Sequence, residues 1–323
     1  MRNSTSHRNV ELLNLIMLLL AAVVSCVLPF DTFLFSYAVL GPLHYLTELQ
    51  WLKKKDYFLP QKKVRLFVFL SVALAFFLFL NYISIFNFYT WNNGVFIGIF
   101  LCVFFIISLY FIFTVKSIAL KSVMIGLLIS CVALYYFKPG IIIFFGLFIP
   151  TIIHVYVFTA VFMISGYLLN PNRLSLLSIV LLLVMPFLIY FLPVETLALE
   201  ISQAKNIFNL TGFKLINQWL VFLTGKTETE ILIIKVQIFI AFAYTYHYLN
   251  WFSKTSVIGW ARSLEPKKMV LVAAIWILSI ALYLINYQTG LMLLFVLSMI
   301  HVLAEFPLNA ISFRTVFQKL FSK

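Results

Sequence analysis

The sequence predicts an all-α fold, a polytopic bundle of about ten transmembrane helices. The 323 residues are 63% hydrophobic and only 10% charged, and the mean hydropathy of the chain is +1.06. Apolar runs long enough to cross a bilayer as helices recur along the chain. Charged residues lie mostly between these runs. We therefore expect a single transmembrane domain over residues 1–323.

The apolar runs define the expected helices in order. The first follows Arg2 and Arg8, and we expect it to be retained, because Pro29-Phe30-Asp31 lacks the small residues of a signal-peptide cleavage site. The expected spans cover residues 11–30, 33–52, 65–86, 94–115, 119–137, 141–167, 174–193, 231–252, 269–287 and 290–309. The alternation of spans and polar connections predicts a multi-pass membrane protein.

Basic residues are distributed unevenly between the two sides of this bundle. Placing both termini in the cytoplasm leaves 18 of the 23 basic residues on the inner side. The outer side keeps Lys138, Lys205, Lys214, Lys226 and Lys235. We attribute the net charge of +13 to topology and expect no nucleic-acid partner, since basic tracts with interleaved aromatic residues are missing from the sequence. The predicted location is the cell (inner) membrane.

One stretch near residues 194–230 differs from the spans. It combines charged and amide side chains with an apolar patch from Leu215 to Leu223. We expect an extracytoplasmic loop or a helix lying in the membrane interface, not a further crossing. Such a segment would be either a lid over a lipid-facing entrance or a plain surface connection.

Four of the five histidines fall inside predicted spans. They are His44, His154, His247 and His301. A charged group in hydrocarbon costs about 2.5–3.5 kcal/mol on insertion scales for Asp, Lys and Arg, so intramembrane ionisable residues usually mark functional sites. All four occupy even-numbered spans, at offsets that place them in the inner half of the bilayer. This pattern indicates a shared metal site or proton-handling site.

Two of these histidines are followed four residues later by a carboxylate. Glu48 follows His44, and Glu305 follows His301. Residues four apart share a helix face, so each pair would supply two ligands, or one ligand and the carboxylate that orients its ring. The alternative is a purely structural role for these residues. Each histidine would then bridge two helices by a hydrogen bond, and each carboxylate would pair with a basic residue at the membrane border.

Short motifs around the four histidines resemble those of a known family. They are Gly41-Pro-Leu-His44-Tyr-Leu-Thr-Glu48, Ile153-His154-Val-Tyr, Tyr246-His247-Tyr-Leu-Asn-Trp251 and Met299-Ile-His301-Val-Leu-Ala-Glu305-Phe306. In this order they resemble the histidine motifs of the Brp/Blh family, which consists of integral-membrane, iron-dependent β-carotene dioxygenases. The resemblance spans nearly the whole chain.

The resemblance implies a ferrous iron, Fe(II), held by the four histidines, with Glu48 and Glu305 as the catalytic carboxylates that orient two of the rings. It also implies dioxygen and an apolar, lipid-like or polyene substrate as partners. The residues that would line the substrate are Tyr45, Tyr156, Tyr248 and Trp251.

The chain departs from the family pattern at four places. Trp251 stands where the family has a further histidine, and Tyr45 replaces a glycine. Thr159, Ala160 and Val161 stand where the family has an acid, and the spacing between the first two histidines is longer than expected for the family. Two other functions therefore remain open. The first is a membrane transporter that carries protons or a metal along the buried His and Glu residues. The second is a family member without catalytic activity.

Overall fold

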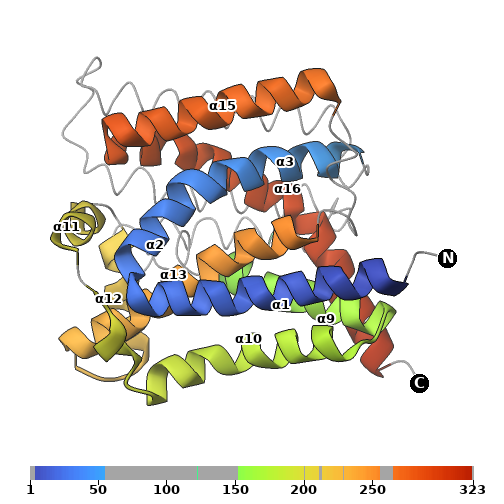
Figure 1. Cartoon of the computed structure of the whole chain (residues 1–323), viewed down its shortest axis with the longest axis horizontal. Coiled ribbons are helices and arrows are strands. Elements are labelled where there is room, and N and C mark those ends of the chain that lie inside the picture. The colour runs from blue at the N-terminus through green and yellow to red at the C-terminus, as the bar shows by residue number, and fades with distance from the viewer. Residues whose placement is uncertain are drawn as a thin grey trace.

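The structure is a computed structural model that describes residues 4–54, 122, 152–199, 201–210, 213–227, 229–254 and 265–321. All regular secondary structure in these ranges is helical, which confirms the all-α prediction (Figure 1). The expected spans at 65–86 and 94–115 lie outside the described residues. So do the span at 119–137, apart from Ser122, and the first part of the span at 141–167.

Four described helices are long and apolar enough to cross a membrane. They are α1 (Ser4–Val27), α10 (Arg173–Phe191), α13 (Glu230–Ser253) and α15 (Pro266–Ile285). Each coincides closely with an expected span, because about 20 apolar residues in a row are needed to cross the hydrocarbon core and few soluble helices have them. The chain is therefore a membrane protein.

Two other expected spans contain a π-helical segment. The segment at 33–52 is built from α2 (Pro29–Phe35), the π-helix η1 (Ser36–Leu40) and α3 (Gly41–Lys54). The end of the span at 141–167 consists of the π-helix η3 (Ile153–Phe158) and α9 (Thr159–Leu169). Inserted π-turns are rare and frequently occur at functional sites. The segment η3 contains His154, and η1 ends shortly before His44.

The remaining elements complete the bundle. The last expected span belongs to a longer helix, α16 (Tyr287–Phe321). The stretch near 194–230 forms the 3₁₀ turn η4 (Val194–Leu197) and the short helices α11 (Ser202–Leu210) and α12 (Phe213–Leu223). These two helices lie at the end of the bundle opposite the N- and C-termini (Figure 1).

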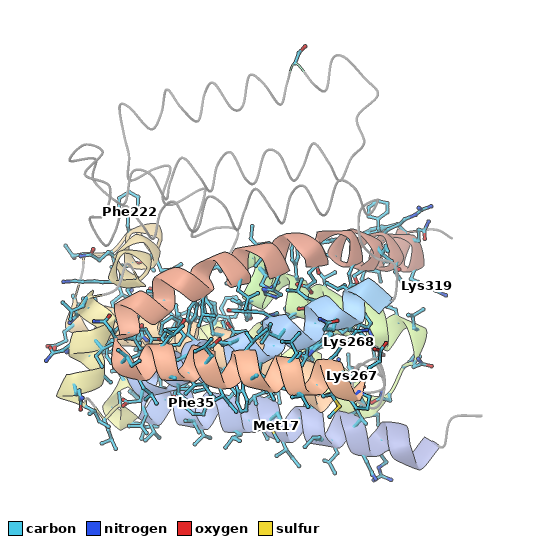
Figure 2. All side chains as sticks on the ribbon, turned by 90° about the horizontal axis from the view of Figure 1, so that it is seen from above. Met17, Phe35, Phe222, Lys267, Lys268 and Lys319 are labelled. Atoms are coloured by element: carbon cyan, nitrogen blue, oxygen red, sulfur yellow. The ribbon has the colours of Figure 1, made fainter. Side chains whose placement is uncertain are left out.

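Helix α13 forms the centre of the described bundle and packs against α1, α2, α3, η3, α10 and α12. On one side Tyr244 contacts the ring of Phe33 in α2, with ring centroids 5.2 Å apart. On another side Phe242 packs in a cluster with Leu18 of α1 and Leu182 of α10. The surface is apolar in many places, as Met17 and Phe35 illustrate (Figure 2). Most of the buried polar residues described below come from α13 and the helices around it.

Candidate metal centre

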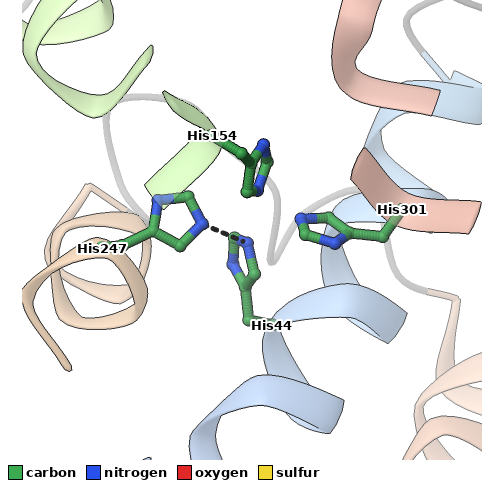
Figure 3. Close-up of side chains that lie close together, drawn as sticks. All are labelled: His44, His154, His247 and His301. Atoms are coloured by element: carbon green, nitrogen blue, oxygen red, sulfur yellow. Dashed lines mark hydrogen bonds between the residues drawn. The ribbon is translucent and has the colours of Figure 1, made fainter. Parts of the chain in front are cut away.

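Four helical elements each contribute one histidine to a single cluster (Figure 3). His44 comes from α3, His154 from η3, His247 from α13 and His301 from α16. One ring nitrogen of each histidine lies within 4.8 Å of the corresponding nitrogen of the others. The side chains are between 1% and 7% exposed. The structure thus brings together all four histidines that the sequence singled out.

A pair of tyrosine hydroxyls joins the helices that carry His44 and His247. The hydroxyls of Tyr45 in α3 and Tyr248 in α13 lie 2.7 Å apart and form a buried hydrogen bond. A Cβ atom at Gly41 would lie 3.1 Å and 3.2 Å from these two oxygens, so glycine leaves room for the pair. The bond sets the spacing of α3 and α13, and with it the approach of their histidines.

The hydrogen bond of His301 fixes which of its ring nitrogens carries the proton. Its Nδ1 lies 3.0 Å from the carbonyl oxygen of Ser298. A carbonyl only accepts, so Nδ1 carries the proton and donates it. In a neutral ring, the form that binds a metal, Nε2 of His301 then carries the lone pair, and it lies 3.2 Å from Oε2 of Glu48.

His247 is oriented in the same way by a hydroxyl. The Thr159 hydroxyl donates to the carbonyl of Val155 at 2.9 Å. Its oxygen lies 2.8 Å from Nδ1 of His247 and accepts the proton of that nitrogen. Nε2 of His247 is left with a lone pair, 3.2 Å from Nε2 of His44. Thr159 thus performs the orienting role that an acid would perform, and the sequence pointed to it only as a departure from the family motif.

Both predicted carboxylates reach into the cluster. Oε2 of Glu48 lies 3.1 Å from Nε2 of His44, its predicted partner on the same helix, and it also contacts His301. Oε2 of Glu305 lies 3.1 Å from Nδ1 of His154, on another helix. Glu48 is 1% exposed and Glu305 8% exposed. These positions place both side chains inside the bundle, at the histidines.

Nε2 of His44 and Nε2 of His247 form a hydrogen bond, but several other polar atoms of the cluster have no partner. Oε2 of Glu48, Oε2 of Glu305, Nε2 of His301 and both ring nitrogens of His154 are buried without a hydrogen-bond partner. Their short separations therefore lack hydrogen-bond geometry, and several lone pairs face a common region. Buried polar atoms are normally paired, because an unpaired one costs about 1–3 kcal/mol. A bound cation would accept one lone pair from each of these residues, including one of the two ring nitrogens of His154.

The dimensions of the cluster fit such a cation. Zinc or iron binds imidazole nitrogen at about 2.0–2.1 Å, so neighbouring ligands lie about 3 Å apart and opposite ligands about 4.2 Å apart. Nε2 of His44 and Nε2 of His247 are 3.2 Å apart, and the whole set lies within 4.8 Å. Both values slightly exceed the expected separations, so a small inward movement of the ligands would close the site. Glu48, His301 and Glu305 form a second group with the same spacing. Two ionised carboxylates among neutral imidazoles would balance the charge of a divalent ion.

A small cavity adjoins the histidines. Its volume is about 20 Å³, enough for one water-sized molecule. The polar wall contains His44, His247 and both carboxylates, and the apolar wall contains Phe158, Phe162, Trp251 and Leu308. The indole nitrogen of Trp251 donates to the Thr47 hydroxyl at 3.1 Å, which holds the ring against the cavity.

The residues predicted to line a substrate take different positions. Trp251 lines the cavity. The ring of Tyr45 stacks on His301 with centroids 4.4 Å apart, and the ring of Tyr248 lies 5.2 Å from that of His44. Tyr156 instead donates to the carbonyl of Leu182 at 2.7 Å and joins η3 to α10. Three of the four therefore contact the histidines or the cavity, and Tyr156 contributes to helix packing.

Fold and site together define a helical membrane protein with a buried cluster of four histidines and two carboxylates that is suited to a metal ion. No family model matches the chain, and neither the curated proteins nor the solved structures contain a significant match.

Proposed function

We propose that this protein is a multi-pass membrane metalloenzyme of the oxygenase type, which binds ferrous iron through His44, His154, His247 and His301. The observation that carries the proposal is the convergence of buried, unpaired lone pairs from the histidines and from two carboxylates. The complete topology that we propose has about ten helices with both termini in the cytoplasm. In its support, Lys267, Lys268 and Lys319 lie at one end of the bundle (Figure 2).

The set of donors favours iron over zinc. Structural zinc sites are closed by four ligands, often with cysteine among them. Here six nitrogen and oxygen donors lie close together, and the described free thiol, Cys26, is on α1 outside the cluster. Imidazole and carboxylate ligands suit iron, and non-haem iron oxygenases use them with positions left open. The chain therefore offers enough donors for a six-coordinate ion with some of them in supporting roles.

Each protein group has a defined task in this proposal. Thr159 and the Ser298 carbonyl hold His247 and His301 with their Nε2 lone pairs turned toward the cluster. Glu305, next to Nδ1 of His154, would orient that ring. Glu48, next to Nε2 of His44 and Nε2 of His301, would supply negative charge at the ion. Bound ferrous iron would supply electrons to dioxygen. The apolar wall of the cavity keeps bulk water away from the site, and the cavity itself has the size of a diatomic molecule.

The substrate class that we propose is an apolar chain dissolved in the membrane, with carotenoid cleavage as the specific reaction. Motif resemblance supports the carotenoid. The cavity that the described residues form next to the histidines holds one water-sized molecule and not a polyene. A polyene would therefore bind after movement of an apolar wall residue such as Trp251 or Phe162.

The test uses the purified full-length protein in neutral detergent, loaded with Fe(II) under anaerobic conditions. Addition of air and β-carotene, or of other apolar chains, should consume dioxygen and give a cleaved or oxygenated product detected by mass spectrometry. The His154→Ala variant should give neither, and Glu230→Gln, at the opposite end of α13 from the cluster, should behave as wild type. If the iron-loaded protein consumes no dioxygen with any apolar chain, the proposed oxygenase activity is wrong. If iron instead crosses the membrane of vesicles that contain the protein, the alternative function as a metal transporter is supported.

A further inference from the structure

A second, larger cavity is lined by residues of α11 and α12, the two short helices at the end of the bundle away from both termini (Figure 1). Its volume is about 330 Å³, within the range of small-molecule sites. The walls come from α2, α11, α12 and the start of α13. None of the histidines of the metal centre belongs to it. The cavity is therefore a separate candidate site.

Lysines from two helices give this cavity a positive charge. Lys205 of α11 and Lys214 of α12 both line it, and the one acidic residue among the lining residues is Glu230. Lys205 and Glu230 are 3.6 Å apart, and their side chains are 31% and 78% exposed. The carboxylate thus lies at the rim, and a net positive charge remains for an anion.

A buried amide in the wall presents an unused acceptor. Nε2 of Gln237 donates to the carbonyl of Pro29 at 3.2 Å, which fixes the orientation of this amide, since a carbonyl only accepts. Oε1 of Gln237 then accepts from Nδ2 of Asn217 at 2.9 Å. Oδ1 of Asn217 has no partner, although the residue is only 2% exposed and lines the cavity. A ligand with a hydrogen-bond donor could therefore pair with Oδ1 of Asn217.

The other walls are apolar, as expected at a membrane border. Phe30 and Phe208 line the cavity and contact each other with ring centroids 5.2 Å apart. Leu210 and Phe222, on the same two short helices, are each 69% exposed. Short helices with exposed apolar side chains and lysines lie in the interface between lipid and water. A ligand for this cavity would combine an anion, a hydroxyl donor and apolar chains.

We propose that this cavity binds a glycerol phosphate group, as carried by an anionic phospholipid. Lys205 and Lys214 would pair with the phosphate, and a glycerol hydroxyl would donate to Oδ1 of Asn217. The acyl chains would lie along Phe30 and Phe208. Basic pockets between transmembrane helices bind lipid headgroups through the same combination of charge and hydrogen bonds.

Native mass spectrometry of the full-length protein in neutral detergent tests the proposal. Titration with phosphatidylglycerol should give about one tightly bound lipid per chain. Binding should be at least about tenfold tighter than that of phosphatidylcholine, because choline has no hydroxyl to donate to Asn217 and its positive charge repels the two lysines. Soluble glycerol 3-phosphate is the second arm. If it competes at a similar concentration, the natural ligand is a soluble phosphate ester; if only the lipid binds tightly, it is a lipid. Either result supports the site.

Two variants and one control distinguish this site from general lipid binding. Lys214→Gln, an exposed residue whose loss leaves the core intact, should weaken phosphatidylglycerol binding about tenfold. Asn217→Leu should weaken phosphatidylglycerol but leave phosphatidic acid, which has no glycerol hydroxyl, unchanged. Lys319→Gln, an exposed lysine at the other end of the bundle, should change nothing. Equal binding of phosphatidylglycerol and phosphatidylcholine, or an equal loss in Lys319→Gln, would overturn the proposal.

Discussion

Helices α13 and α15 are both long enough to cross a membrane, and they differ most in where they lie. The most apolar part of α13 has a mean hydropathy of 1.4, and 72% of it is buried inside the protein. The corresponding part of α15 has a mean hydropathy of 2.3, and only 17% of it is buried. The less hydrophobic helix is thus the one in the centre.

The difference in burial between α13 and α15 follows from the lipid environment that surrounds a membrane protein. Lipid chains are as apolar as leucine, so burial inside a membrane bundle brings no hydrophobic gain, and polar groups turn inward to find partners. Buried Gln237, Tyr248 and Asn250 lie on α13 beside His247, whereas α15 exposes Ile277 and Leu278. In a chain of this class, a drop in hydropathy within a span therefore indicates the functional interior.

Substitution at the tight end of α15 should have the largest effect on stability. A Cβ atom at Gly290 of α16 would lie 2.8 Å from ring carbons of Tyr283 and 2.9 Å from its Cα. Gly290→Ala should therefore lower the free energy of unfolding by about 1–3 kcal/mol, because the two backbones must separate. Denaturant unfolding in detergent measures this change. Leu278→Ala, at a site that is 60% exposed, should change the free energy of unfolding by no more than about 0.5 kcal/mol. Equal effects of the two substitutions would contradict the contrast between the packed and the exposed parts of α15.

The next largest effect is expected on metal affinity, at the contact between Thr159 and His247 of the central helix α13. Thr159→Val keeps the shape of the side chain but removes the oxygen that accepts from Nδ1 of His247. We expect metal affinity to fall about 10–100-fold, as for other groups that orient a metal ligand. Competition with a chelator of known affinity measures the change. Thr159→Ser keeps the hydroxyl and should bind as wild type, and a fall of the same size in Thr159→Ser would contradict the orienting role.

The smallest effect is expected at the tyrosine pair between α3 and α13. Tyr248→Phe removes one partner of the 2.7 Å hydrogen bond to Tyr45 and should cost about 0.5–1.5 kcal/mol of stability. Tyr167→Phe, on the partly exposed face of α9, is the matched control and should be nearly neutral. If the two variants unfold at the same denaturant concentration, the pair does not hold these helices together.

Hydropathy was sufficient to predict the four described helices that are long and apolar enough to cross a membrane, because a continuous apolar run is a property of the local sequence. The coincidence of four intramembrane histidines likewise pointed to a common site. The pairing within that site depends on how helices pack. Helical spacing places Glu305 on the face of His301, but only the packing of η3 against α16 brings it to His154.

The roles of Thr159 and Tyr156 show the same limit. Thr159 lies 88 residues before the histidine that it orients, and no spacing rule connects them. Tyr156 is two residues from His154, and positions two apart do not share a helix face. That spacing indicates only that Tyr156 does not share the face of His154; its hydrogen bond to α10 depends on how the helices pack. The family resemblance stays a prediction, since it rests on short motifs.

The most direct test of the account is the metal content of the purified protein after anaerobic loading with Fe(II) and removal of excess ion. Wild type and Leu278→Ala should retain about one iron per chain, and His247→Ala and His301→Ala should retain less than about a tenth of that with unchanged helical content by circular dichroism. Folded wild type without bound iron, or histidine variants that retain as much iron as wild type, would contradict the metal centre.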